Sequence, residues 1–204
     1  SLPDQGQWAE RPQVPGPDDC PKRNYRFDND TSIMSRMDVR LADGRDFAQM
    51  DGVPGTGRSA LWARMKDPIE WSPAMLAILG DYVPFGIGQA LGAQAGGNSL
   101  DNTLRVVQIV PTDWVLVDIR VQAIHHGFGH GVVHLWAEDG TLMGTASQST
   151  IVRHWSNPER PGSQPDDPHV KRASASAAVD GDGDASDGDG DTAATPHQAE
   201  EATS

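Results

Sequence analysis

The sequence of 204 residues has a single cysteine, Cys20, so no internal disulfide can form. Cys20 lies in a Pro-rich stretch with no nearby base to lower its pKa, which argues against a thiol nucleophile. No apolar run approaches the roughly 20 residues needed to cross a bilayer, and the N-terminus lacks the regions of a signal peptide. We therefore expect a cytoplasmic protein without a membrane span.

Basic residues are also scarce, because 16 Lys and Arg stand against 29 Asp and Glu, for a formal net charge of −13. Eight of the acidic residues lie in 173–204, which holds no Lys or Arg, so the rest of the chain is only mildly acidic. Nothing resembles the basic stripe that neutralises phosphates. Nucleic acid is not an expected partner.

Composition divides the chain into three regions. Residues 1–30 are polar and rich in proline, which is typical of an extended linker rather than a packed element. Residues 31–155 carry periodic apolar patterns and form the one predicted domain. Residues 156–204 lose that periodicity and turn to Pro, Ser, Ala, Gly and Asp, which predicts a disordered acidic tail.

The predicted domain is α+β, with an apolar helix covered by antiparallel strands. Ser72 caps the helix 72–80 and Pro73 occupies its first turn. Pro84 removes the hydrogen bond to the Gly80 carbonyl and bends the segment where Asp81 interrupts the apolar run. Strands are expected near Met37, from Arg58, and then, after a Gly-rich turn at Gly92–Gly97, as a meander of Thr103–Val110, Trp114–Ala123, Gly129–Trp136 and Leu142–Val152.

Two stretches imitate ligand-binding motifs. Gly52–Ser59 nearly spells a phosphate-binding loop, but Arg58 replaces the lysine and a strand pattern, not a helix, follows. Asp180–Asp184 resembles the start of a calcium loop, but Ala185 stands where Gly is needed. We interpret the first as an ordinary loop and the second as part of the solvated tail.

Four histidines invite a metal hypothesis, since imidazole is a common metal ligand. They straddle a strand-turn-strand junction rich in glycine, and no carboxylate or thiolate joins them at ligand spacing. A structural role is favoured and no metal site is predicted. These histidines are His125, His126, His130 and His134.

Three polar residues stand out against apolar elements: Asp81 in the buried helix, Ser99 just before a core strand and Gln148 within Leu142–Val152. A buried carboxylate requires hydrogen-bond donors, and Gln and Ser side chains supply them. Each residue can simply be a satisfied core polar group. If the three share a cavity, they can instead hold and polarise a water molecule, with Asp81 as the base.

The same residues carry a family resemblance. LAILGDYVPFG resembles the helix motif of acyl-CoA thioesterase II proteins, and SLDNTLRVVQIVPTDWVLVDIR is similar to their following strand pair. GHGVVHLWAEDGTLMGTASQSTIVR resembles their C-terminal motif. The order and spacing agree from Pro73 to His154. The resemblance implies a hot-dog fold, in which an antiparallel sheet wraps around a long central helix, and places this domain second in a double hot-dog protein.

The resemblance assigns the water-activating roles to Asp81, Ser99 and Gln148. It implies hydrolysis of acyl-CoA to free fatty acid and CoA, without a cofactor. The chain departs from the family pattern at Asn102, where a His is common, and at Ser149-Thr150, where Glu-Gly is usual. For the acyl chain we expect a wall on the apolar helix made of Leu76, Leu79 and Phe85.

Two other functions remain open from the sequence. A lone hot-dog domain leaves a sheet edge exposed, so the chain could be a noncatalytic assembly module or a half-domain. A second hot-dog domain is an expected partner, supplied by a homo-oligomer or by a missing N-terminal half. A hot-dog hydratase would need a His beside Asp81 on the helix, and none occurs in residues 72–92.

Overall fold

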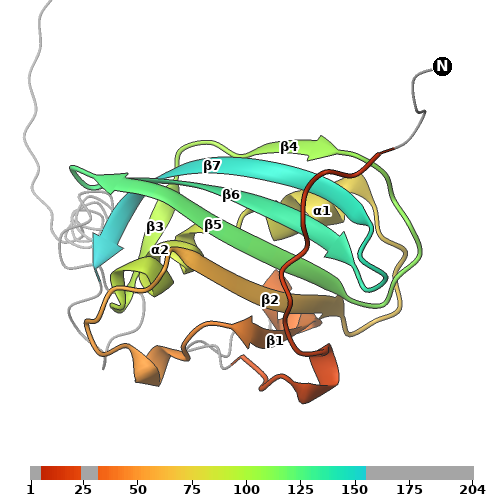
Figure 1. The fold of residues 1–204 in the computed structure, drawn as a ribbon, viewed down its shortest axis with the longest axis horizontal. Coiled ribbons are helices and arrows are strands. Elements are labelled where there is room, and N and C mark those ends of the chain that lie inside the picture. The colour runs from red at the N-terminus through yellow and green to blue at the C-terminus, as the bar shows by residue number, and fades with distance from the viewer. Residues whose placement is uncertain (1–5, 24–31, 155–204) are drawn as a thin grey trace, which may run out of the picture. The chain divides into compact units, whose positions relative to one another are not determined.

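The computed structural model describes residues 6–23 and 32–154, which belong to one compact unit. The described residues form a seven-stranded antiparallel sheet in the order β1-β2-β5-β6-β7-β3, with β4 also paired to β7 (Figure 1). The strands are β1 (Met37–Asp43), β2 (Arg58–Met65), β3 (Ala95–Ser99), β4 (Thr103–Val106), β5 (Val115–His125), β6 (Phe128–Ala137) and β7 (Leu142–His154). Short 3-10 helices occur at Pro17–Asp19, Ile33–Arg36 and Phe47–Gln49.

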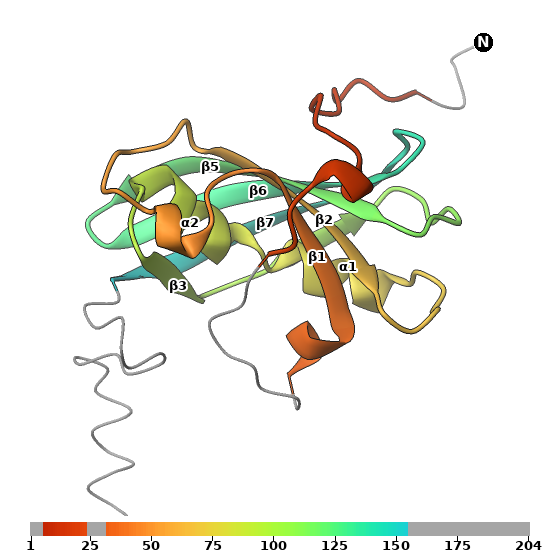
Figure 2. The same ribbon diagram turned by 90° about the horizontal axis from the view of Figure 1, so that it is seen from below.

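Two consecutive α-helices pack on one face of the sheet: α1 (Pro73–Gly80) and α2 (Val83–Leu91). The Ser72 hydroxyl accepts a hydrogen bond from the Met75 N–H at 3.3 Å and so caps α1. The predicted interruption occurs at Asp81 and Tyr82, with Pro84 in the first turn of α2. The predicted α+β arrangement, a sheet around a helix, is therefore present (Figure 2).

Pro73–Leu91 is 19 residues long and apolar enough, by length and composition, to cross a membrane. That finding corrects the expectation that no apolar run comes near this length. The same test is passed by the core helix of a globular domain, and half of this stretch is buried in the fold. Here the stretch packs against the inner face of the sheet and is interrupted at Asp81.

Two sequence expectations about the strands were wrong. The chain turns at 92–94, where Gly92 has φ of +63°, and the segment then continues from Ala95 as β3 along β7. A side chain at Gly97 would place its Cβ 1.7 Å from the Thr150 hydroxyl oxygen, so glycine permits this close pairing. β4 ends at Val106 and pairs with β7, not with β5, so the meander contains only β5, β6 and β7.

The core lies between the helices and the inner face of the sheet. Strand residues alternate between the two faces, as the period of two requires, and inward positions such as Leu61, Val117 and Leu135 have no exposed surface. Ile87 of α2 and Leu79 of α1 pack among them. This core fixes the helices relative to the strands that carry the polar residues.

Residues 6–20 lie against the outer face of the sheet, opposite the helices, and 21–23 continue along the edge strand β1, where the Arg23 N–H donates to the Val39 carbonyl at 2.8 Å (Figures 1 and 2). Trp62 donates its indole N–H to the Pro15 carbonyl at 2.9 Å, and Cys20 is buried beside it. Burial, together with Asp19, raises the pKa of the Cys20 thiol. The Pro-rich segment was expected to be an extended linker rather than a packed element, and in the structure its residues pack beside Trp62, Trp114 and Trp136. The predicted acidic tail, 156–204, lies outside the described residues.

Candidate active site

Asp81, Ser99 and Gln148 meet in a closed triangle of hydrogen bonds. Ser99 Oγ donates to Asp81 Oδ1 at 2.9 Å, and Gln148 Nε2 donates both to the same Asp81 oxygen and to Ser99 Oγ, the latter at 2.8 Å. The residues come from the end of α1, the end of β3 and the middle of β7. The structure thus brings together three side chains that are far apart in the sequence.

The Gln148 amide has a defined orientation and no spare hydrogen. Its nitrogen must face the Asp81 carboxylate, because the amide oxygen there would repel it. Both N–H groups are then used by Asp81 and Ser99. Gln148 is fully buried, and its carbonyl oxygen finds no donor among the described residues, which costs about 1–3 kcal/mol of desolvation.

Asp81 is solvent-facing and is held only by neutral donors. No Lys or Arg of the described residues forms an ion pair with it, and nothing there donates to its second oxygen, Oδ2. Ser99 is also exposed, whereas Gln148 lies beneath both. The arrangement leaves one carboxylate oxygen free to take a proton from a molecule arriving from solvent.

Close packing of α1 on β7 sets the position of Asp81. A Cβ at Gly80 would lie 2.8 Å from the Cβ of Ala146, so the glycine lets the helix end approach the strand. Gln148 follows Ala146 on the same face of β7, two residues along. Asn102 donates to the carbonyl of Ala77 at 3.3 Å and so also holds the last turn of α1.

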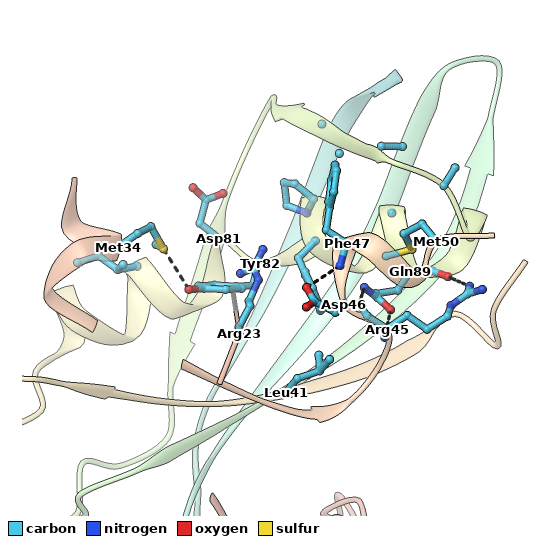
Figure 3. Close-up of a pocket in the computed structure, with 18 of the residues that line it drawn as sticks. Arg23, Met34, Leu41, Arg45, Asp46, Phe47, Met50, Asp81, Tyr82 and Gln89 are labelled. Atoms are coloured by element: carbon cyan, nitrogen blue, oxygen red, sulfur yellow. Dashed lines mark hydrogen bonds between the residues drawn. The ribbon is translucent and has the colours of Figure 1, made fainter. Parts of the chain in front are cut away.

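A cavity of about 740 Å³ opens beside Asp81. Figure 3 shows Met34 and Asp81 on one side of the residues drawn, Met50, Gln89 and Arg45 on the other, and Phe47 between them. Its walls come from α1, α2, β3 and the segments before and after β1, and they are mostly apolar. The volume lies within the range typical of small-molecule sites.

Of the three residues predicted for an acyl wall, Phe85 lines the cavity. Leu76 and Leu79 do not line it, because both point into the core and have no exposed surface. The face of α1 that reaches the cavity carries Ala77 and Ile78 instead. The helix is apolar on all sides, so its sequence gave no sign of which face would meet the sheet.

Several cavity residues escaped the sequence analysis. Tyr82 donates its hydroxyl hydrogen to the Met34 sulfur at 3.3 Å, and the Arg23 guanidinium lies 4.5 Å from the centre of the Phe85 ring. Phe47 and Met50 belong to the loop between β1 and β2. That loop carried a signal in its Asp46–Gln49 capping box, which predicts a helical turn.

The histidines lie apart from this site. His126, with φ of +48°, and Gly127 form the tight turn between β5 and β6. His130 and His134 pair with β7 and β5 on the outer face, and burial, helped by Arg120, lowers the pKa of His134. Within residues 6–23 and 32–154, no three His, Cys, Asp or Glu side chains gather closely enough to hold a metal ion.

A sheet wrapped around a central helix, with a carboxylate at the break in that helix, defines the class of hot-dog thioesterases. The sequence model of the family described as the acyl-CoA thioesterase C-terminal domain matches residues 17–152. The chain belongs to this family. A comparison with curated proteins gives no match.

Solved structures agree with this assignment. A protein assigned as a thioesterase from Novosphingobium aromaticivorans is 35% identical, with a TM-score of 0.61 over 74% of this chain and 58% of that one. A hot-dog protein of unknown function from Alicyclobacillus acidocaldarius is 22% identical, with a TM-score of 0.61 over 76% of this chain and 59% of that one. An acyl-CoA thioesterase II from Mycobacterium marinum is 22% identical, with a TM-score of 0.56 over 76% of this chain and 60% of that one. The chain thus spans about three fifths of these proteins.

Proposed function

We propose that this domain hydrolyses acyl-CoA thioesters to free fatty acid and CoA, using a water molecule activated by Asp81. The observation that carries the proposal is the hydrogen-bonded triangle of Asp81, Ser99 and Gln148 at one end of a largely apolar cavity. The polar triangle suits the thioester and the apolar walls suit an acyl chain. Family membership supports a thioester hydrolase.

In this mechanism Asp81 Oδ2 accepts a proton from the water while the water oxygen attacks the thioester carbonyl carbon. The new C–O bond gives a tetrahedral oxyanion, and its collapse breaks the C–S bond. Asp81 returns the proton to the departing sulfur, so that water and thioester yield carboxylic acid and thiol. Ser99 and Gln148 hold the other carboxylate oxygen and keep Oδ2 turned toward the water.

Oxyanion stabilisation requires a different donor from Gln148 Nε2. Both hydrogens of that amide already bind Asp81 and Ser99, so donating to the oxyanion would break one of these bonds. A backbone N–H is the remaining donor in this proposal, and one such donor is commonly worth about 3 kcal/mol. The Gln148 side chain then acts by positioning Asp81.

A second hot-dog domain is the partner that we propose. In the described residues neither β3 nor β4 pairs with a second strand, and Leu100, Val106 and Val107 expose apolar surface along this edge. Light scattering of the purified chain gives its mass in solution. A dimer supports pairing with a second copy, whereas a monomer that is fully active alone contradicts the need for a partner.

The activity is tested by release of free CoA thiol from acyl-CoAs of increasing chain length. Wild type is compared with Gln148→Ala and Ser99→Ala, and Ser149→Ala is the matched control because Ser149 lies on the opposite face of β7. We expect hydrolysis by wild type and Ser149→Ala. Ser99→Ala removes one hydrogen bond to a charged group and should lower kcat about tenfold or more.

A folded wild-type protein that releases no thiol, alone or with a second hot-dog domain, would contradict the proposal and favour the noncatalytic assembly module. Equal rates for Gln148→Ala and wild type would remove the assigned role of the triangle. Circular dichroism of each variant checks that the fold is retained.

A further inference from the structure

The far end of the cavity is formed by the loop between β1 and β2, residues 44–57, which is here called the β1–β2 loop. Phe47 and Met50 of this loop line the cavity together with α2. Asp46 caps the short helix that carries Phe47, and the Gln49 side-chain oxygen accepts a hydrogen bond from the Asp46 N–H at 2.8 Å. The capping box fixes the backbone beside Phe47.

A polar clamp holds this loop on α2. The Gln89 side chain accepts from the Arg45 N–H at 2.7 Å and donates to the Arg45 carbonyl at 2.9 Å, which is a complete amide-to-backbone pair. Gln89 is only 5% exposed although it is polar. A buried amide with both groups satisfied indicates a defined position for the loop.

The same loop satisfies the carbonyls at the C-terminal end of α2. Arg45 donates to the Gln89 carbonyl at 3.1 Å, the Gly55 N–H to the Ala90 carbonyl at 2.9 Å and the Gly52 N–H to the Gly92 carbonyl at 2.8 Å. Carbonyls in the last turn of a helix lack their usual partner four residues further on, and a cation near them is favoured by the helix dipole. The capping Gly92 N–H also donates to the Gln89 carbonyl, at 3.2 Å. Arg45 is itself held by Asp51 at 2.7 Å.

The contact leaves no room for movement toward α2. A Cβ at Gly55 would lie 2.6 Å from the Gln89 carbonyl oxygen, and one at Gly92 would lie 1.9 Å from the Val53 carbonyl oxygen. The loop backbone is therefore seated directly on the helix end. Phe47 and Met50 therefore line the cavity from a loop that hydrogen bonds hold on α2.

We propose that the β1–β2 loop, clamped by Gln89 and Arg45, closes the end of the cavity away from Asp81, and that Phe47 and Met50 set the longest acyl chain the site accepts. This inference rests on the proposed function for its substrate. The thioester lies at Asp81, and the acyl chain extends past Phe47 toward Met50, which are labelled in Figure 3.

The test uses two readouts with one set of variants. The first is the dissociation constant of free fatty acids of increasing length, measured by displacement of a fluorescent fatty acid. The second is kcat/KM for the matching acyl-CoA series. The variants are Phe47→Ala, which enlarges the cavity, Phe47→Trp, which fills it, and Val53→Ala as a control on the same loop, because Val53 does not line the cavity.

We expect wild type and Val53→Ala to share one length limit. Phe47→Ala should accept chains about two carbons longer, with affinity for the first excluded chain rising roughly tenfold, since each buried methylene contributes appreciably. Phe47→Trp should shorten the limit. The opposite shifts keep the test informative if one variant is destabilised.

The two proposals fail differently. An unchanged length limit in both Phe47 variants, or no fatty-acid binding by wild type, would overturn the role of the β1–β2 loop. If the Phe47 variants shift the longest fatty acid that binds while no acyl-CoA is hydrolysed, the role of the β1–β2 loop is supported. Only the proposed thioesterase activity is then refuted.

Discussion

Carboxylates on the two sides of the sheet have different hydrogen-bond donors. On the outer face, Asp118 binds Arg120 at 2.8 Å and Asp38 binds Arg40 at 3.0 Å, and both acids are largely buried. On the inner side, the donors that Asp81 meets within the described part of the chain are the neutral Ser99 and Gln148, and Asp81 remains exposed. The outer carboxylates are held by charged donors, whereas Asp81 is positioned by neutral donors and its Oδ2 has no donor among the described residues.

The difference predicts that outer-face substitutions act on stability and inner-face substitutions act on activity. The outer face buries three tryptophans beneath residues 6–23 and contributes to folding. The inner face carries the cavity and the polar triangle.

The largest stability effect is expected from Trp62→Ala on the outer face. Trp62 is 1% exposed and its indole N–H binds the Pro15 carbonyl, so truncation should lower the free energy of unfolding by about 3–5 kcal/mol. Urea denaturation measures this loss. Trp8→Ala is the control, because Trp8 is 83% exposed and its loss should change stability by less than about 0.5 kcal/mol. Equal effects of the two would refute the packed role of residues 6–23.

Gly80→Ala should act mainly on activity. The added Cβ would meet Ala146 at 2.8 Å and push the end of α1 from β7, which displaces Asp81. A small misplacement of a catalytic group can lower kcat/KM by about 10- to 100-fold. Gly16→Ala serves as a control, since its nearest neighbour would be 3.9 Å away. Full thioesterase activity in Gly80→Ala would show that the position of α1 is not critical.

The smallest effect concerns pH and Asp38. Burial alone would raise the pKa of Asp38, but Arg40, with Arg64 and Lys22, outweighs it, so the pKa lies below its ordinary value. The charged form therefore stabilises the fold above pH of about 4, and this contribution is lost as the pH falls through the lower folded pKa. Asp38→Asn should cost about 0.5–1 kcal/mol at neutral pH. The unfolding curves of variant and wild type should converge in acid, and a constant difference would contradict the shift.

Much of the fold was accessible from sequence. Ser72 and Pro73 predicted where the helix begins, and Pro84 predicted its interruption. β3 was missed because Gly96 and Gly97 read as a turn, whereas their lack of side chains is what allows pairing against Thr150. The register of β4 with β7 depends on contacts between distant segments, which local patterns do not encode.

The polar residues of the candidate site could be predicted from the sequence, but its cavity walls and the clamp could not. Asp81, Ser99 and Gln148 stood out as polar residues in or beside apolar elements, and the family resemblance grouped them. The cavity walls were not predictable at Leu76 and Leu79, because a helix that is apolar on every side does not reveal which face meets the sheet. The clamp between Arg45 and Gln89 joins residues 44 positions apart and leaves no local signal.

The most direct test compares Asp81→Asn with Asp118→Asn, the same change on the two faces, by thiol release and urea unfolding. We predict that Asp81→Asn lowers kcat by about 10²- to 10⁴-fold with stability nearly unchanged. Asp118→Asn should lose about 2 kcal/mol of stability and keep its kcat, because only a charged hydrogen bond to Arg120 is weakened. Wild-type activity in Asp81→Asn would contradict the central claim that Asp81 activates the water.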